Sequence, residues 1–309
     1  MPISGVEAAA MSRGSIGWVP RASAPASTAC AKARAMATGS PALATAVFSS
    51  TASYPISIAA AAWLGAAIGL TVLARAELAM YLPLVVVPVV WFRTDLEARA
   101  RLGRIAVVGL AALVMLAPWS LYNAARFERP VLVSTNDGLT LIGSNCDSVF
   151  SGPLVGLWNG FCADDVPADG DQSEVSAAYR SAALSYVGDH LDRLPTVVAA
   201  RVGRVWGVYK PTQMATYSVG EGRERTLSLI GGWVYYPLTL AAVAGAVLLW
   251  RERRPVWPLL APFAMVTVTA MLLYGLTRFR VPAEVAIVVL AAVLVDRVLP
   301  ATRAPSGSG

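Results

Sequence analysis

The sequence predicts an all-α polytopic membrane protein with about six transmembrane helices and one mixed α/β loop domain outside the membrane. The first observation is composition: 56% of the 309 residues are hydrophobic and 14% are charged, whereas soluble domains carry about 25% charged residues. The second is a series of apolar runs close to the roughly 20 residues that a helix needs to cross the hydrocarbon. The third is one long polar stretch, residues 123–226, which holds 12 of the 19 acidic residues.

Residues 1–55 precede the first predicted span. This segment is rich in Ala, Ser, Thr and Pro, and Glu7 is its only acidic residue. It has no apolar core long enough for a signal peptide. We therefore interpret it as a low-complexity segment, either disordered or mistranslated, with a targeting segment as the alternative. No function is assigned to it.

Six apolar runs are the predicted spans. They cover residues 56–74, 78–92, 105–122, 227–250, 256–275 and 283–299. The second is short and contains Pro83 and Pro88, so we expect it to be kinked or re-entrant. Three spans (56–122) precede the loop domain and three (227–299) follow it, and residues 300–309 form a cytoplasmic tail.

Arginine-rich loops predict the orientation of these spans. Residues 93–104 contain four arginines, and residues 251–254 read RERR. Short loops rich in arginine stay cytoplasmic, and both loops can do so because two spans separate them. Residues 123–226 are then exoplasmic, together with the loop that holds Arg278 and Arg280. These features predict an integral protein of a bacterial plasma membrane.

The loop domain is predicted to combine strands with helices. The NDG triplet at residues 136–138 is a turn signal between VLVS and LTLI, which favours a β-hairpin. Asp171 and Glu174 resemble a capping box at the start of a helix over residues 172–193.

A second helix of the loop domain is predicted from the segment TVVAARVGRVWGVY. Val198, Val202 and Val205 recur in it at helical spacing. We expect this helix to lie on the membrane surface, with Arg201 and Arg204 toward the lipid headgroups.

Two of the three cysteines lie in the loop domain. Cys146 and Cys162 are sixteen residues apart on the face predicted to be oxidising, so a disulfide between them is expected. The alternative is two unpaired cysteines. The third cysteine, Cys30, lies in the N-terminal segment.

Few side chains suit catalysis or metal binding. His190 is the only histidine, and we favour a surface or packing role for it over catalysis. Asp164 and Asp165 form an acidic pair that could bind a divalent cation, although a solvated turn is favoured. No metal site and no cofactor is otherwise predicted. The chain lacks a basic stripe with interleaved aromatic residues, so nucleic acid is not an expected partner.

Four stretches of the chain together resemble a known family. They are GLTVLARAELAMYLPLVVVP (69–88), APWSLYNAARFERPVLVSTNDGLTLIGSNCD (117–147), YVGDHLDRLPTVVAARVGRVWGVYKP (186–211) and YGLTRFRVPAEVAIVVLAA, which begins at residue 274. In this order, on alternating spans and loops, they resemble the C-terminal part of bacterial membrane glycosyltransferases of family 39, the dolichyl-phosphate-mannose protein mannosyltransferase type. The resemblance covers about 56–299.

The resemblance implies a partial GT-C helical bundle and a transferase activity. Such enzymes move a sugar from a polyprenyl-phosphate donor to a protein, lipid or glycan acceptor on the outer face. Their general base is an acidic residue of the first outer loop, which residues 1–55 do not match, so the catalytic residues are unknown. Glu77 matches a different part of the family and is not assigned as the base. Because a general base contributes about 10²–10⁴-fold, we expect little transferase activity from this chain alone.

Arg278, Arg280 and Arg75 are the predicted donor phosphate-binding residues. The planar guanidinium gives bidentate, charge-assisted hydrogen bonds to phosphate oxygens. The alternative is that these arginines only reach toward the headgroups of membrane lipids. The alternative function is a non-catalytic membrane protein that binds or transports an anionic lipid or glycan.

Overall fold

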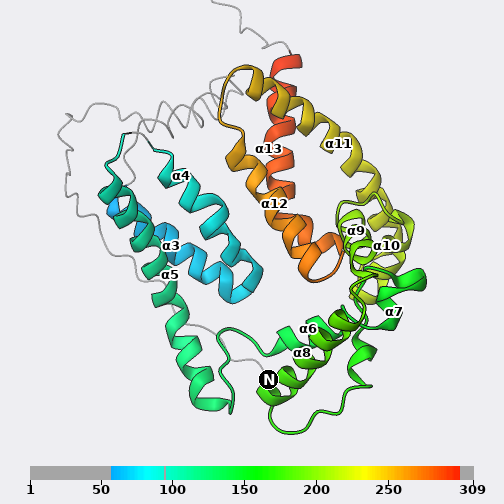
Figure 1. Ribbon diagram of the computed structural model, residues 1–309. Helices are drawn as coiled ribbons and strands as arrows, with labels where there is room; N and C mark the ends of the chain where they lie inside the picture. The colour runs from blue at the N-terminus through cyan, green and yellow to red at the C-terminus, as the bar shows by residue number, and fades with distance from the viewer. Residues whose placement is uncertain (1–56, 94, 300–309) are drawn as a thin grey trace, which may run out of the picture. The chain divides into compact units, whose positions relative to one another are not determined.

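The computed structural model describes residues 57–93 and 95–299, and every regular element within these ranges is helical (Figure 1). The predicted all-α character is therefore confirmed for the described part of the chain. The predicted strands are wrong, because no strand forms in these ranges. Residues 1–55 and the tail 300–309, for which the sequence analysis also made predictions, lie outside the described residues.

The first group of helices covers the first three predicted spans. Its members are α3 (Ile58–Ala74), the 3₁₀ helix η1 (Ala76–Met80), the π-helix η2 (Leu82–Val86), α4 (Val87–Trp91) and α5 (Ala98–Arg126). The second predicted span is thus broken into three short helices. Pro83 and Pro88 lie at the starts of η2 and α4, where a residue without an amide proton is tolerated.

Close packing of α3 on α5 depends on two glycines one helical turn apart. A Cβ atom on Gly65 would lie 2.2 Å from the carbonyl oxygen of Val108, and one on Gly69 would lie 2.7 Å from that of Ala112. The bare glycine surface therefore lets the two backbones touch. Small residues at this spacing are typical of helix pairs inside membranes.

The polar loop between the spans also folds into helices. They are α6 (Asn136–Ile142), α7 (Asp147–Phe150), η3 (Gly152–Leu154), η4 (Gly160–Ala163), α8 (Gln172–Asp189), α9 (Leu194–Val205), α10 (Pro211–Tyr217) and η5 (Ser218–Glu221). The predicted capping box is confirmed: the Asp171 side chain accepts from the amides of Ser173 and Glu174, and Glu174 accepts from the amide of Asp171. The helix ends at Asp189, four residues before the predicted end.

The NDG triplet starts α6 instead of turning a hairpin. The amide of Gly138 donates to Ser176 Oγ at 3.1 Å, and Asp137 accepts from Ser176 and from Arg180. A Cβ atom at Gly138 would lie 2.2 Å from the Ser176 carbonyl oxygen. The glycine is therefore needed for close packing of α6 on α8, and these long-range contacts override the local turn signal.

The last group of helices covers the three C-terminal predicted spans. It consists of α11 (Arg225–Arg251), α12 (Trp257–Leu272), η6 (Thr277–Arg280) and α13 (Val281–Val298). Helices α11 and α13 pack against each other (Figure 1). Helix α12 contacts α13 on one side and α9 of the loop domain on another.

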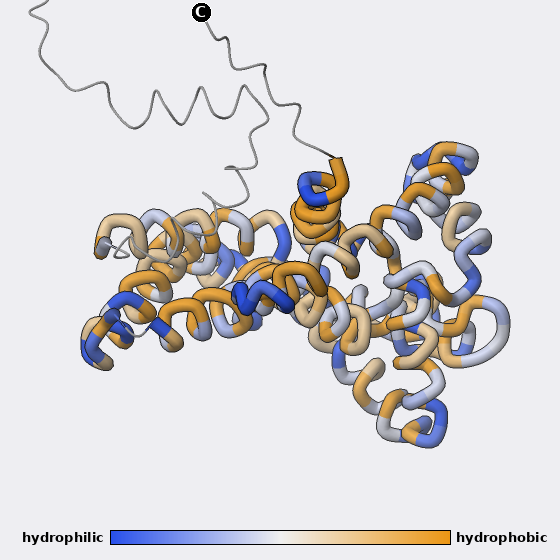
Figure 2. Tube along the Cα trace, turned by 90° about the horizontal axis from the view of Figure 1, so that it is seen from above, coloured by the Kyte–Doolittle hydropathy of each residue, from blue (hydrophilic) through white to orange (hydrophobic). Residues whose placement is uncertain are grey.

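Two of the six predicted spans form helices that are long and apolar enough to cross a membrane. By length and composition these are α5 and α11, within the described residues. The other predicted spans are helical but shorter or, in α13, carry more charge, so length and composition do not support six spans. Figure 2 shows apolar residues along most helical turns and hydrophilic residues gathered near helix ends and loops.

Candidate functional site

A cleft of about 650 Å³ lies between the first half of α11, η6 and the start of α13. We call it the Arg280 cleft. Its charged lining residues are Arg223, Glu224, Arg278, Arg280 and Glu284, and most of its remaining lining is apolar. Two of the three predicted phosphate-binding arginines therefore share one cavity.

Arg280 is the most buried cation of this cleft. It is 8% exposed, and its guanidinium carbon lies 3.5 Å from the ring centroid of Tyr235 on α11. Its Nε donates to Glu284 Oε1 at 2.8 Å, one turn later on α13. Within residues 57–93 and 95–299 its two terminal nitrogens make no hydrogen bond, so they are available to a ligand. An aromatic face and a carboxylate thus hold the guanidinium in one orientation.

Arg278 lines the same cleft but is already paired. Its Nη1 donates to Glu221 at 2.9 Å, and Nη2 donates to the hydroxyl of Tyr274. Its guanidinium also lies over the rings of Tyr274 and Phe279. These contacts join η6 to η5, so Arg278 shapes the cleft with donors that are largely occupied.

Arg75 lies outside the cleft lining. Its Nε donates to Glu77 Oε1 at 2.7 Å, and its guanidinium carbon lies 5.4 Å from the ring centroid of Phe279. Since Arg278 lies over the same ring at 5.7 Å, Phe279 contacts both cations. The predicted third phosphate contact therefore neighbours η6, but it does not line the cavity with the other two.

Gly207, at the end of α9, brings the loop domain up to Arg280. Its φ is +72°, and a Cβ atom there would lie 3.7 Å from Arg280 Nη1. The Tyr236 hydroxyl donates to the Gly207 carbonyl oxygen at 2.6 Å. Sequence analysis missed Gly207, Tyr235 and Tyr236, because no local pattern links them to a residue more than 40 positions later.

The prediction that Arg201 and Arg204 point toward lipid headgroups is wrong. Arg201 is 2% exposed and Arg204 is fully buried. Arg201 Nη1 donates to the carbonyl of Met271 at 3.2 Å, and Nη2 donates to the carbonyl of Ser144 and to Asn145 Oδ1. Burial lowers the pKa of Arg201 to about 10, which leaves it charged at neutral pH.

Arg204 is held in the same way by the segment before η4. Its Nε donates to the Val155 carbonyl at 2.6 Å, and Nη2 donates to the carbonyl of Pro153 at 3.1 Å and to Gln213 Oε1 at 3.0 Å. Burial lowers its pKa as well. In the described part of the chain neither of these two arginines has a carboxylate partner. They act as internal connectors between chain segments.

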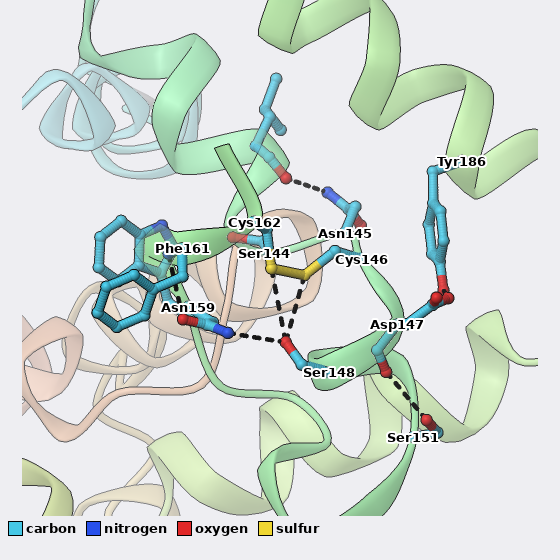
Figure 3. The surroundings of a disulfide bond; sticks show 12 residues. Ser144, Asn145, Cys146, Asp147, Ser148, Ser151, Asn159, Phe161, Cys162 and Tyr186 are labelled. Carbon is cyan, nitrogen blue, oxygen red and sulfur yellow. Dashed lines mark hydrogen bonds between the residues drawn. A yellow bond between two sulfur atoms is a disulfide. The ribbon is translucent and has the colours of Figure 1, made fainter. Parts of the chain in front are cut away.

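Cys146 and Cys162 form the expected disulfide, with their Cα atoms 6.2 Å apart (Figure 3). Ser148 Oγ lies 3.5 Å from both sulfur atoms and accepts from Asn159 Nδ2 at 2.9 Å. The preceding residue, Asn145, is one of the acceptors of Arg201. The bridge therefore secures the segment that binds this buried cation.

The remaining titratable candidates have ordinary surroundings. His190 stacks on Tyr186 with ring centroids 4.1 Å apart, and its Nδ1 lies 2.8 Å from the Tyr186 carbonyl oxygen, which is a packing role. Asp164 and Asp165 are exposed. Among the described residues no three or more His, Cys, Asp or Glu side chains are grouped to hold a metal ion.

Comparison with known proteins identifies no relative of this chain. No protein-family model, curated protein or solved structure matches the chain. The site is therefore interpreted from its own contacts.

Proposed function

We propose that the Arg280 cleft binds the phosphate of a polyprenyl-phosphate-linked sugar, and that the protein is a membrane glycosyltransferase that resembles family 39. Arg280 carries this proposal. It is a buried cation in a largely apolar cleft, oriented by Tyr235 and Glu284, with two terminal nitrogens left to donate. A polyprenyl phosphate combines a phosphate for such a group with an apolar chain for the remaining lining.

The charge of the cleft supports an anionic ligand. Two of its cations, Arg278 and Arg280, are paired with glutamates, but the Glu284 side chain is 43% exposed. A carboxylate that is partly in water neutralises a buried guanidinium incompletely. A phosphate oxygen that accepts from both terminal nitrogens would complete its hydrogen bonds. In a transfer reaction the same guanidinium would stabilise the negative charge that gathers on the departing lipid phosphate.

The location in a membrane is supported by α5 and α11. On α11, Trp233 is 71% exposed and Trp250 is 73% exposed, and their separation along the helix is about 25 Å at 1.5 Å per residue. Trp250 lies at the end of α11 and Trp233 lies more than two turns after its start; exposed tryptophans at this separation on an apolar helix are typical of the two interfaces of a bilayer. We propose that the shorter apolar helices complete a bundle of about six spans, with residues 123–226 on the exoplasmic face of a plasma membrane.

The second candidate is a protein that binds or moves an anionic lipid or glycan without transferring a sugar. It is favoured by the acidic residues near η6, since Glu77 pairs with Arg75 and Glu221 pairs with Arg278. Carboxylate oxygens that already accept from an arginine are less available to accept the proton of an acceptor hydroxyl. Both candidates share the same phosphate site and differ in the chemistry that follows.

Binding is tested with the full chain reconstituted in phosphatidylcholine nanodiscs and titrated with a polyprenyl phosphate and its mannose-linked form. Arg280→Lys keeps the positive charge but loses the planar pair of terminal nitrogens, and Arg280→Met removes both the charge and these donors. Because a hydrogen bond to a charged group contributes about 1.5–3 kcal/mol, Arg280→Met should weaken binding at least tenfold. The matched control is Arg297→Met, which removes an arginine near the far end of α13 that pairs with Glu252 outside the cleft. Equal affinity of the Arg280→Met and Arg297→Met variants would exclude this site.

Transfer is tested separately by following a radiolabelled sugar from the lipid donor to protein, lipid or glycan acceptors in the same nanodiscs. The two candidates predict different outcomes after binding. Arg280-dependent transfer supports the glycosyltransferase. Because this chain alone is expected to transfer little sugar, transfer is compared with the background of the Arg280→Met variant. Arg280-dependent binding with no transfer above that background supports the second candidate.

Orientation is tested by single cysteines in a Cys30→Ser background. Leu184 on α8 is 63% exposed, and a Cβ atom at Gly103 would meet no atom within 4 Å. Leu184→Cys should react with an impermeant maleimide in intact cells, and Gly103→Cys should react only after lysis. The reverse pattern would place residues 123–226 in the cytoplasm.

A further inference from the structure

The Arg280 cleft has a closed end between α11 and α13. A Cβ atom on Gly245 would lie 1.9 Å from the carbonyl oxygen of Leu290, so the two backbones touch there. Toward their other ends the helices leave room for the cleft, which Tyr235 and Leu238 line from α11 and Val288 lines from α13. On α13 the lining therefore ends at Val288, two residues before the Gly245–Leu290 contact, and on the side of Arg280 it continues to Arg223 and to Pro211 and Met214 of α10.

Two adjacent glycines widen this cavity on the α11 side. Gly231 and Gly232 both line the cleft, and a Cβ atom on either would meet no atom within 4 Å. Unlike Gly245, they are not required for contact between helices. They leave a strip of α11 without side chains along the cleft that Arg280 also lines.

The polarity of the lining changes along the cleft. Arg223 and Glu224 lie where α11 begins, whereas Val234 and Val288, farther along the two helices, form an apolar rim in which each residue is more than half exposed. An apolar rim suits an opening toward hydrocarbon better than one toward water. The polar end suits a headgroup.

We infer, on the basis of the proposed function, that the cleft encloses only the first part of the ligand's lipid tail and that the rest leaves between α11 and α13 into the bilayer. From Arg280 to Val288 the cleft follows α13 for about 12 Å at 1.5 Å per residue. With carbon–carbon bonds of about 1.5 Å, this length holds roughly ten carbons of an extended chain. Beyond it the Gly245–Leu290 contact blocks the path. The ligand class is thus a phosphate carried on a long apolar chain, of which the phosphate-proximal carbons are recognised.

The inference is tested by photo-crosslinking in nanodiscs of the full chain. Two lipid phosphates carry a diazirine, one about six carbons from the phosphate and one about sixteen, on either side of the expected length of about 12 Å. The near probe should label peptides of α11 and α13 that line the cleft. The far probe should label mainly phosphatidylcholine.

Gly232→Leu places a side chain in the space for the tail and should reduce labelling of the cleft by the near probe at least fivefold. Gly109→Leu is the matched control, because Gly109 is also a helical glycine with no atom within 4 Å of its Cβ position, on α5 and outside the cleft. It should leave labelling unchanged. Inorganic phosphate should displace the near probe far less effectively than an equal concentration of unlabelled lipid phosphate.

The outcomes separate this inference from the proposed function. If Arg280→Met leaves all labelling unchanged, the phosphate site itself is absent. If labelling depends on Arg280, three results would overturn the tail inference alone: equal labelling of the helices by the far and near probes, equal effects of Gly232→Leu and Gly109→Leu, or full displacement by inorganic phosphate.

Discussion

Two pairs of arginines on adjoining segments have opposite surroundings. Arg201 and Arg204 of α9 are buried and donate to carbonyl and amide oxygens from four other segments. Arg278 and Arg280 of η6 each have a glutamate partner, yet Arg280 keeps two terminal nitrogens that bond to nothing in the described chain. Burial alone therefore does not mark a ligand site. Unused donors that face a cavity mark it.

The difference has a physical origin. A buried guanidinium loses its hydration, and carbonyl oxygens can replace the lost hydrogen bonds without a counter-charge. Arg201 and Arg204 are satisfied in this way, apart from Arg201 Nε, which has no partner. Arg280 contacts an aromatic face and one carboxylate, which hold it in place and leave its two terminal nitrogens without a hydrogen bond.

The largest expected effect is the loss of stability in Arg204→Met. This change leaves the Val155 carbonyl and Gln213 Oε1 without their charged donor inside the protein, whereas the Pro153 carbonyl still accepts from Gln213 Nε2 at 3.0 Å. Because each unsatisfied buried polar group costs about 1–3 kcal/mol, we expect unfolding to become easier by about 4 kcal/mol. Thermal unfolding in detergent, followed by circular dichroism, measures the change. Arg280→Met, whose partner is partly solvated, should shift the midpoint much less; equal shifts would remove the distinction between the two pairs.

The second effect concerns the bridge beside Arg201. Replacing both Cys146 and Cys162 by serine should lower stability by about 3 kcal/mol, the loop-closure contribution for a bridge of this separation. Binding of a polyprenyl phosphate should change less than threefold, because the bridge secures the Arg201 side and does not line the Arg280 cleft. The same unfolding and nanodisc assays measure both quantities. A larger fall in affinity than in stability would show that the two regions are coupled.

A smaller effect is expected for the ion pair between Arg278 and Glu221. Their side chains are 40% and 25% exposed, and ion pairs in contact with water contribute about 0.2–1 kcal/mol. A double-mutant cycle with Arg278→Met and Glu221→Gln should therefore give a coupling free energy below about 1 kcal/mol. A coupling as large as the effect of Arg204→Met would place Arg278 with the structural arginines.

The smallest effect is a pH dependence at the capping box of α8. The Ser173 hydroxyl and the amides of Glu128, Glu174 and Ser173 lower the pKa of Asp171 from 3.8 to about 2. Because the folded-state pKa is the lower one, the stabilisation is complete above pH 4 and is lost as pH falls toward 2. Unfolding midpoints measured across this range should show a shallower acid slope for Asp171→Asn. An unchanged slope would mean that other carboxylates account for it.

Several features could be predicted from the sequence because they depend on neighbouring residues. The capping box needs only Asp171 and Glu174, three residues apart, and the apolar runs predict helices without knowledge of their partners. Arg278 and Arg280 were singled out because arginines are unexpected beside apolar runs on that face. The hairpin predicted from the NDG triplet is wrong because a turn signal is also local. Contacts with Ser176 and Arg180 of α8 place residues 136–138 in a helix instead.

The sequence by itself determined the helical character of the apolar runs, the capped start of α8 and the presence of arginines within η6 and α9. The tertiary structure alone decided which of these arginines became internal connectors and which one kept free donors. The partners of Arg201 lie 56 to 70 positions away along the chain, and Tyr235 meets Arg280 from another helix. Desolvation and hydrogen bonding depend on such distant neighbours. The periodic valines of α9 therefore predicted a helix on the membrane surface, whereas packing against other segments buries its arginines.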